Sequence, residues 1–344
     1  MQAIERAISH GDWLRRSPAR FGGAGAHKEW LHFCVYGAGV DVLANFSLVD
    51  DVRLGHGRPG ELARTTLLVR ETRWMGEIAR HAGRDVEIEG GGIALRIGPS
   101  SVHFADGRYH LRAAFARRPV AIDLELEPVT MPSIVNNVQV GDGPSLNWLV
   151  VPRLVARGRV TIGDRVHEID GALAYHDHNW GRFGWGRDFA WEWGYGLPDD
   201  PRVPWSLVFV RLSNRAHTRS MMQGAFLWRG PREHRVFRDR DLEVRHVSLL
   251  RAERVCKIPP VMALIHPELA TAVPRQLVFS AASEGDSLTA EFTSRDVAQV
   301  IIPNDRDVGV TIINEVSGDL AVEGVVRGEA VSIHGRAIFE FLGA

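Results

Sequence analysis

The chain has 344 residues, of which 45% are hydrophobic and 24% charged, a balance typical of folded globular proteins and not of disordered or fibrous ones. Its 41 basic and 42 acidic residues give a formal net charge of −1, so bulk electrostatics does not favour binding to nucleic acid. Cys34 and Cys256 cannot form a disulfide framework, no apolar run reaches the ~20 residues that span a bilayer, and the N-terminal stretch lacks the apolar core of a signal peptide. We therefore expect a cytoplasmic protein without nucleic-acid partners.

Most of the chain has the pattern of short β-strands. A short helix is predicted at the N-terminus, where Ile4, Ala7 and Ile8 recur at helical spacing. From Glu29 onwards, apolar or alternating runs of strand length are separated by Gly, Asp-Gly and Pro, and Asp106-Gly107 is a typical hairpin turn. The only later candidate for a helix is at about residues 260–272. The pattern predicts an all-β chain of antiparallel strands that form a sandwich or a barrel.

Two landmarks recur at nearly the same spacing and indicate an internal repeat. Glu29-Trp30 opens the first run of strands, and Glu192-Trp193 opens a second run 163 residues later. The stretch around Gly171 resembles the stretch around Gly335, which lies 164 residues later. We therefore predict two copies of one β-barrel that meet near residue 180.

The most unusual stretch is the row Tyr175-His176-Asp177-His178-Asn179, which a cluster of tryptophans follows. Such a row is costly to bury unless each polar group finds a partner. Residues two apart in a strand share a face, so Tyr175, Asp177 and Asn179 should lie on one face. His176 and His178 should then lie on the other.

The repeat also predicts which face of this strand points inward. The 164-residue offset places Asp177 at the position of Phe341, which belongs to the apolar face of the last strand. Asp177 should therefore point into the first barrel, whereas His176 and His178 should point away from it. Desolvation in an apolar barrel disfavours the charged carboxylate, which raises its pKa and keeps the group a proton donor.

Two interpretations of this acid remain open. An acid beside aromatic rings can protonate an electron-rich alkene, because tryptophan and tyrosine faces stabilise the carbocation that forms. Alternatively, Asp177 closes the barrel structurally by accepting hydrogen bonds from Tyr175, Asn179 or backbone amides, and the tryptophans pack the core.

We expect neither a metal nor a cofactor. His176 and His178 form a His-x-His pair, but nothing fixes the further ligands that a metal site needs. The candidates for a third ligand are Glu192, His32 and His167. No glycine-rich phosphate loop leads from a strand into a helix, and no GxSxG motif supplies a serine nucleophile.

The motif YHDHNWG at 175–181, followed by WEWG at 191–194, resembles the signature of the carotenoid 1,2-hydratase (hydroxyneurosporene synthase)-like and AttH-like superfamily. Glu29–Phe33 resembles its opening strand, and Asn147-Trp148 resembles a further landmark. The resemblance implies two lipocalin-like barrels. The superfamily also contains kievitone-hydratase-like and cyclase-like proteins and fungal decalin-forming Diels–Alderases.

The resemblance also implies roles for particular residues. In the carotenoid hydratases the aspartate of this motif is the supposed proton donor and the nearby tyrosine assists, which implies Asp177 and Tyr175 as catalytic residues here. Those enzymes carry a His-x-Trp pair one strand earlier, whereas this chain has Asn147-Trp148 without a histidine, which argues against a carotenoid substrate. The residues expected to contact the substrate are Trp148, Asn147, Asn179, His176, Trp30 and Trp193.

We therefore predict two lipocalin-like antiparallel β-barrels in tandem, over residues 1–180 and 181–344, with few short helices. The expected function is that of a hydratase (lyase) or cyclase, in which Asp177 protonates an alkene of an apolar isoprenoid or polyketide-derived molecule. Asn179 or His176 would position the water or hydroxyl that attacks. The alternatives are a Diels–Alderase-like pericyclase acting on a polyene and a non-catalytic lipid or pigment carrier. The expected partner is a hydrophobic small molecule, collected from a membrane by peripheral contact at most.

Overall fold

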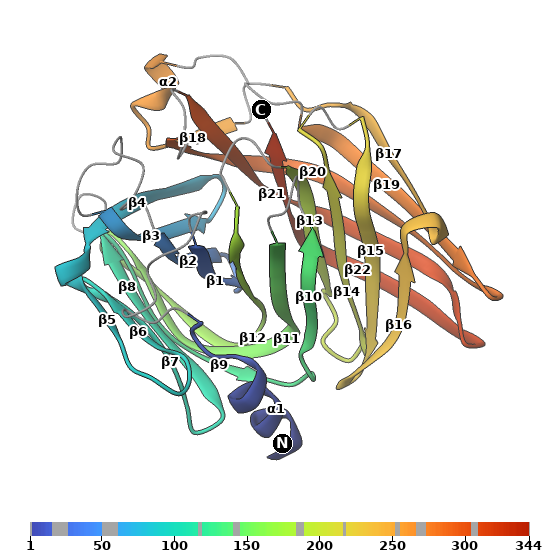
Figure 1. The fold of residues 1–344 in the computed structure, drawn as a ribbon, viewed down its shortest axis with the longest axis horizontal. Helices are drawn as coiled ribbons and strands as arrows, with labels where there is room; N and C mark the ends of the chain where they lie inside the picture. The colour runs from blue at the N-terminus through green and yellow to red at the C-terminus, as the bar shows by residue number, and fades with distance from the viewer. Residues whose placement is uncertain are drawn as a thin grey trace. The chain divides into compact units, whose positions relative to one another are not determined.

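The computed structural model describes residues 2–15, 27–49, 61–115, 119–139, 145–183, 189–215, 218–251, 255–265, 273–303 and 309–343. These residues form two compact units, one up to residue 183 and the other from residue 189 (Figure 1). Each unit is built around one large, almost entirely antiparallel β-sheet, which confirms the prediction of an all-β chain with tandem barrels. No helix among the described residues combines the length and the apolarity needed to cross a membrane.

Barrel 1 is the sheet of the first unit. Its twelve described strands follow the order β4-β3-β2-β1-β12-β11-β9-β8-β7-β6-β5, and β10 pairs with β11. The predicted N-terminal helix is present as α1 (Gln2–Gly11), and η2 (Gly83–Asp85) is a 3₁₀ turn. The strands are β1 (His27–Tyr36), β2 (Asp41–Val49), β3 (Glu61–Arg70), β4 (Trp74–Ala82), β5 (Val86–Ile88), β6 (Ala94–Ile97), β7 (Ser100–Ala105), β8 (Arg108–Phe115), β9 (Val120–Pro128), β10 (Ser133–Gln139), β11 (Ser145–Ile162) and β12 (Arg165–Arg182).

Barrel 2 is the sheet of the second unit. Its ten described strands follow the order β16-β15-β14-β13-β22-β21-β20-β19-β17, and β18 pairs in parallel with β20. The strands are β13 (Ala190–Pro198), β14 (Trp205–Ser213), β15 (Ser220–Arg229), β16 (Arg232–Arg238), β17 (Leu242–Leu249), β18 (Val255–Ile258), β19 (Pro274–Ser283), β20 (Asp286–Pro303), β21 (Val310–Val326) and β22 (Glu329–Gly343). A 3₁₀ turn, η3 (Asp239–Asp241), precedes β17. The later helix is present as α2 (Met262–Ile265), and residues 266–272 of its expected range lie outside the described residues.

The two barrels repeat one local arrangement of side chains. In barrel 1, Glu29 of β1 lies opposite Trp180 of β12, and the Asn147 amide of β11 donates to the Trp180 carbonyl at 3.2 Å. In barrel 2 the same arrangement, with the same 3.2 Å hydrogen bond, is made by Glu192, Phe341 and Asn314. The repeated Glu-Trp pair in the sequence therefore marks equivalent strands, β1 and β13.

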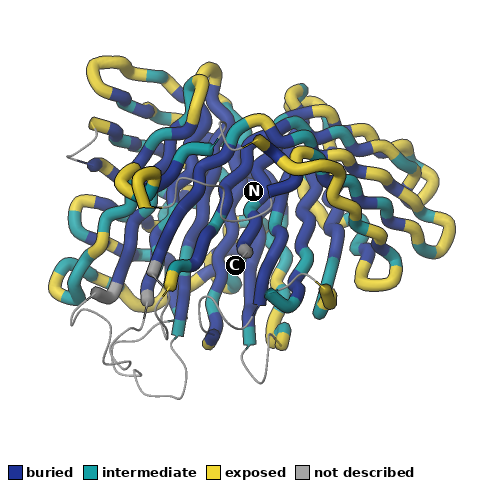
Figure 2. The backbone as a smooth tube through the Cα atoms, turned by 90° about the horizontal axis from the view of Figure 1, so that it is seen from above, coloured by how far each residue is buried: buried dark blue, intermediate teal, exposed yellow. Residues whose placement is uncertain are grey.

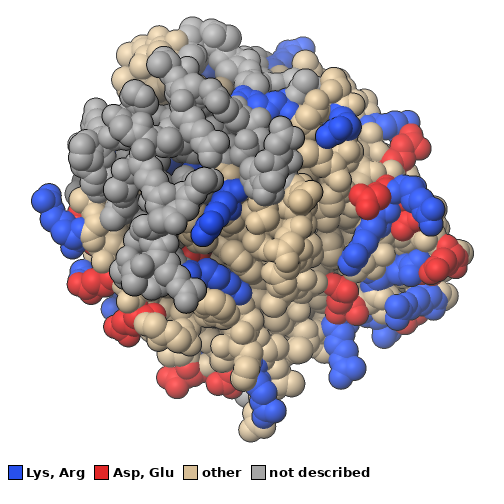
Figure 3. Space-filling view, in the orientation of Figure 1, with Lys and Arg blue, Asp and Glu red and all other residues tan. Residues whose placement is uncertain are grey.

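Apolar side chains fill the interior of each barrel. Buried residues follow the strands and exposed residues gather at the hairpin turns (Figure 2). The Asp106-Gly107 turn has positive φ at both positions (51° and 76°), as the hairpin prediction requires. On the face drawn in Figure 3, basic and acidic side chains are interspersed.

The inward face of β12 is the opposite of the one predicted. In β1, Leu31 and Phe33 belong to the apolar core of barrel 1, so the alternate residues of β1 point outward. Phe33 pairs with His176, and His32 pairs with Asp177. His176 therefore points into barrel 1, and Asp177 lies on its outer face.

A β-bulge at Gly171 explains the error. The pairing of β11 with β12 shifts between Ala156 and Arg157, opposite Gly171, whose φ is +73°. Ile169 and Ala174 both belong to the core although they are five positions apart, whereas in a regular strand only residues an even number of positions apart share a face. The pairing of β22 with β21 is regular through the corresponding stretch. One extra residue reverses the face of every residue that follows, which is why the offset misplaced Asp177.

Candidate functional site

The outer face of barrel 1 brings together five of the predicted site residues, which we call the outer-face cluster. Asn179 of β12 lies between Trp30 of β1 and Trp148 of β11, so these three are direct cross-strand neighbours. Asp177 and Tyr175 follow at two-residue intervals on the same face of β12. Four of the five are buried, and Trp30 is half-buried.

Asp177 is the acidic group of the outer-face cluster. Its side chain is 3% exposed, and the amide nitrogen of Asn179 donates a hydrogen bond to its Oδ1. Its cross-strand neighbours are His32 and Val150. The Asn179 amide therefore fixes one carboxyl oxygen of Asp177, and this is a contact that the structural interpretation also expected.

His176 and Asn147, two other predicted substrate contacts, point instead into barrel 1. His176 stacks on Phe33, with ring centroids 4.1 Å apart. The Asn147 side chain binds backbone groups, accepting from the Asn137 amide and donating to the Trp180 carbonyl. We expected His176 to position the nucleophile beside Asp177, and the register shows that it cannot, because the two residues lie on opposite faces of β12.

Trp193, the remaining predicted contact, belongs to the second unit. It lies on β13 beside Gly194, which points inward against the Phe339 ring, so Trp193 is on the outer face of barrel 2. Its cross-strand neighbour there is Glu340.

The interior of barrel 1 holds a buried polar network, which we call the inner network, centred on Asp12. Its Oδ2 accepts from the Tyr109 hydroxyl at 2.5 Å and lies 3.0 Å from Nε2 of His176, and its Oδ1 lies 2.6 Å from Nδ1 of His178. Nε2 of His178 lies 2.8 Å from Oε1 of Glu29. The side chains of Asp12, Glu29, His176 and His178 are all fully buried.

Opposite charges stabilise one another in the inner network. Burial raises the pKa of Asp12, but His178 and His176 outweigh that effect and hold its pKa well below the usual range. The pKa of Glu29 is likewise lowered, to about 2, because its hydrogen bonds with His178 and His27 outweigh the rise in pKa that burial causes. Burial lowers the pKa of His178, but Asp12 and Glu29 overcome it and raise the pKa to about 9. His178 is therefore an imidazolium that donates to a carboxylate from each nitrogen.

The inner network fastens the segment after α1 to the barrel. The backbone N–H of Arg15 donates to Oε1 of Glu29 at 2.7 Å, and the Arg15 guanidinium lies 3.8 Å from the centroid of the Trp180 ring. Nδ1 of His176 lies 2.9 Å from the carbonyl oxygen of His32. Both histidines of the His-x-His pair thus have oxygen atoms at both ring nitrogens, which favours a structural role. The absence of a metal stays a prediction.

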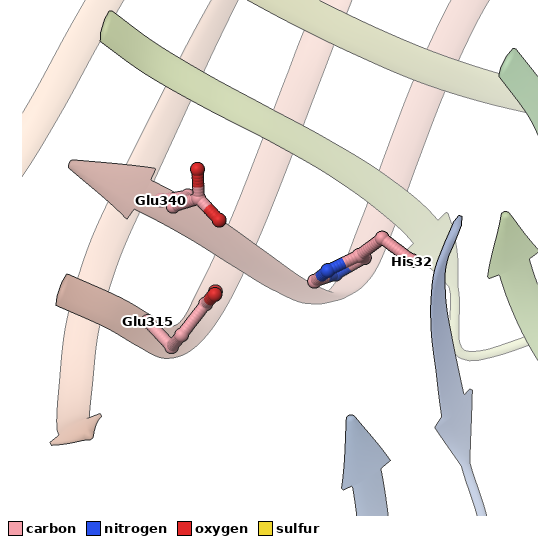
Figure 4. Close-up of side chains that lie close together, drawn as sticks. All are labelled: His32, Glu315 and Glu340. Atoms are coloured by element: carbon pink, nitrogen blue, oxygen red, sulfur yellow. The ribbon is translucent and has the colours of Figure 1, made fainter. Parts of the chain in front are cut away.

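Barrel 2 carries a carboxyl pair on its outer face. Glu315 of β21 lies opposite Glu340 of β22 (Figure 4). The Trp191 indole N–H donates to Glu340. Burial raises the pKa of Glu340, and hydrogen bonds with Glu315 and Trp191 offset only part of that effect. Burial therefore favours the protonated form of Glu340.

Sequence reasoning missed several of these residues. Asp12 lies 164 residues before His176 in the chain and follows a short helix that showed no functional pattern. Tyr109 and Glu340 sit in ordinary alternating strands. The one available signal was the repeated Glu-Trp pair, which pointed to a shared role for Glu29 and Glu192.

Comparisons with known proteins identify relatives by fold. No protein-family model matches the sequence, and no curated protein sequence matches it either. Among solved structures, an AttH-type protein from Nitrosomonas europaea matches with a TM-score of 0.60 and 14% identity over 97% of both chains. Kievitone hydratase from Nectria haematococca matches with a TM-score of 0.56 and 11% identity over 92% of this chain and 89% of that one. CghA, solved with Sch210972, matches with a TM-score of 0.55 and 12% identity over 93% and 88%. The chain therefore has the fold of these proteins, as the resemblance implied.

Proposed function

We propose that the protein is an enzyme that hydrates or cyclises an alkene of an apolar small molecule, with Asp177 as the proton donor. The observation that carries this proposal is the outer-face cluster, where a buried carboxyl group shares one face of the sheet with Tyr175, Trp30 and Trp148. An isoprenoid or polyketide-derived substrate would supply the alkene. The name of one relative in fold, kievitone hydratase, is in keeping with this chemistry.

The proposed reaction begins with transfer of the Asp177 proton to one alkene carbon. The positive charge then develops on the other, more substituted carbon, where the faces of Trp30, Trp148 and Tyr175 stabilise it. Water, or a hydroxyl group of the substrate, attacks this carbon and releases a proton. The Asp177 carboxylate accepts that proton and is ready for another turnover, while the Asn179 amide keeps it in position.

The test is an Asp177→Asn variant assayed with prenylated phenols, which carry a trisubstituted alkene on an apolar body. Asparagine keeps the size of the side chain but cannot donate the proton, so turnover should fall by about 10²-fold or more while the probe still binds. The matched control is Asp170→Asn, because Asp170 lies on the same strand and its side chain is 92% exposed. Wild-type turnover by a folded Asp177→Asn variant would overturn the assignment.

A second variant covers the case in which Asp177→Asn does not fold. Tyr175→Phe removes one hydroxyl group from the same face of β12 and leaves the ring in place. It should slow turnover without changing the melting temperature by more than the Asp170→Asn control does. Full turnover by a folded Tyr175→Phe variant would show that the Tyr175 hydroxyl takes no part in the reaction, and probe binding without any turnover in the wild type would favour the carrier.

A further inference from the structure

Barrel 2 contains a glutamate–histidine contact that mirrors the inner network of barrel 1. The side chain of Glu192 is 1% exposed, and its Oε1 lies 3.2 Å from Nε2 of His246 and accepts from Nη1 of Arg211 at 3.3 Å. In barrel 1 the equivalent glutamate, Glu29, contacts Nε2 of His178 at 2.8 Å. Each barrel therefore uses the glutamate of its Glu-Trp pair to hold a histidine by the same ring nitrogen.

The residues of this second contact point into barrel 2. His246 of β17 pairs with Leu277 of β19, which belongs to the apolar core. Arg211 of β14 pairs with Glu192, which itself lies opposite the core residue Phe341. Cross-strand partners share a face, so all three polar side chains are directed towards the interior.

The two barrels differ in the hydrogen-bond partner of the second ring nitrogen, Nδ1, of this histidine. In barrel 1, Nδ1 of His178 binds the carboxylate of Asp12. In barrel 2, no residue within the described ranges bonds Nδ1 of His246, and Nε of Arg211 is buried without a hydrogen-bond partner among them. The side chains of His246 and Arg211 are nevertheless 35% and 18% exposed, so solvent reaches this part of the interior.

The charges of the two barrels differ in the same way. In barrel 1, the carboxylates of Asp12 and Glu29 balance the imidazolium of His178 and the guanidinium of Arg15. Among the described residues of barrel 2, the second contact has a glutamate, a histidine and an arginine but no second carboxylate. A buried guanidinium N–H without an acceptor is costly, and an anion is the acceptor that a guanidinium pairs with best.

We propose that barrel 2 binds an apolar carboxylic acid, whose carboxylate takes the place that Asp12 takes in barrel 1. Arg211 would donate to this carboxylate and His246 would contact it through Nδ1, while Glu192 holds both side chains in place. The apolar body is favoured by the adjoining aromatic residues. The Phe341 ring stands edge-on to His246 with ring centroids 6.4 Å apart, and the Phe339 ring of the apolar core lies 6.3 Å from Phe341.

The test compares dodecanoate with dodecan-1-ol, which has the same chain and no charge, by isothermal titration calorimetry on the whole protein. Dodecanoate should bind more tightly than the alcohol by about tenfold or more, the value of a charge-assisted hydrogen bond. His246→Gln and Arg211→Gln should each remove most of this preference while leaving binding of the alcohol unchanged. The control is His334→Gln, which changes an exposed histidine of the same barrel and should keep the preference.

Equal affinity for acid and alcohol in the wild type, or a preference that survives both variants, would overturn the proposal. If the variants do not fold, the ¹⁵N spectrum of the wild-type histidines replaces them: dodecanoate should shift the His246 resonances and dodecan-1-ol should not. Asp177→Asn should leave dodecanoate binding unchanged. The proposal therefore stands or fails independently of the reaction assigned to the outer face of barrel 1.

Discussion

His178 lies between two buried carboxylates and gives barrel 1 a defined response to pH. Its pKa is raised from 6.5 to about 9, so its contribution to the free energy of unfolding is complete below pH 6.5 and is lost as the pH rises through about 9. Each pKa unit corresponds to about 1.4 kcal/mol, which makes the expected loss on the order of 3 kcal/mol. Asp12 and Glu29 act in the opposite direction, because their lowered pKa values contribute stability that is present at neutral pH and is lost only as the pH falls into the acid range.

The measurement is urea unfolding between pH 6 and pH 10 in the wild type and in a His178→Gln variant. The stability difference between the two proteins should shrink as the pH rises, because only the wild type has an imidazolium to lose. His334→Gln serves as the control, since this exposed histidine should leave the wild-type curve unchanged in shape. Parallel curves for wild type and His178→Gln would show that folding does not shift the pKa of His178.

At the residue scale, the sequence identified the polar row but not its partners. The spacing of Tyr175, Asp177 and Asn179 correctly placed them on one face, because strand alternation is a local property. Asp12 could not be assigned to His176 and His178, because their contact depends on how a distant segment folds back onto the barrel. A hydrogen bond between residues so far apart leaves no mark on local sequence.

At the element scale, β12 depends on its bulge at Gly171. The φ of Gly171 is +73°, and a Cβ there would meet no atom within 4 Å, so only the backbone conformation opposes a side chain. Gly171→Ala should therefore lower the free energy of unfolding by about 1 kcal/mol. The control is Gly90→Ala, where a Cβ is equally uncrowded and φ is not in the left-handed region. Equal stability of the two variants would show that the bulge does not need glycine.

The same bulge marks the limit of what the sequence predicts about the strands. Alternation of apolar and polar residues gave the strands and the Asp106-Gly107 hairpin correctly. Alternation could not show whether Asp177 points inward or outward. One inserted residue at Gly171 reverses the faces of the strand without changing the alternation on either side of it. Of the helix expected at about residues 260–272, only α2 lies in the described residues.

For the whole molecule, the repeat was the most informative sequence feature. Two Glu-Trp pairs predicted two barrels, and the structure has the same glutamate–aromatic–asparagine arrangement in each. The fold is shared with an AttH-type protein and kievitone hydratase at 14% and 11% identity. A fold can persist at such identity because barrels need a pattern of inward apolar residues and not particular ones. The chemistry has to be established from individual residues.

Turnover of prenylated phenols in D₂O tests proton transfer from Asp177 to an alkene carbon most directly. The carboxyl group exchanges its proton with solvent, so each product molecule should carry one carbon-bound deuterium at the protonated position, detected by mass spectrometry and ²H NMR. The wild type and Asp170→Asn should give this labelled product, and Asp177→Asn should give about 10²-fold less or none. Product formed without carbon-bound deuterium would contradict proton transfer to an alkene carbon. Labelled product formed equally fast by Asp177→Asn would contradict the role of Asp177 as the proton donor.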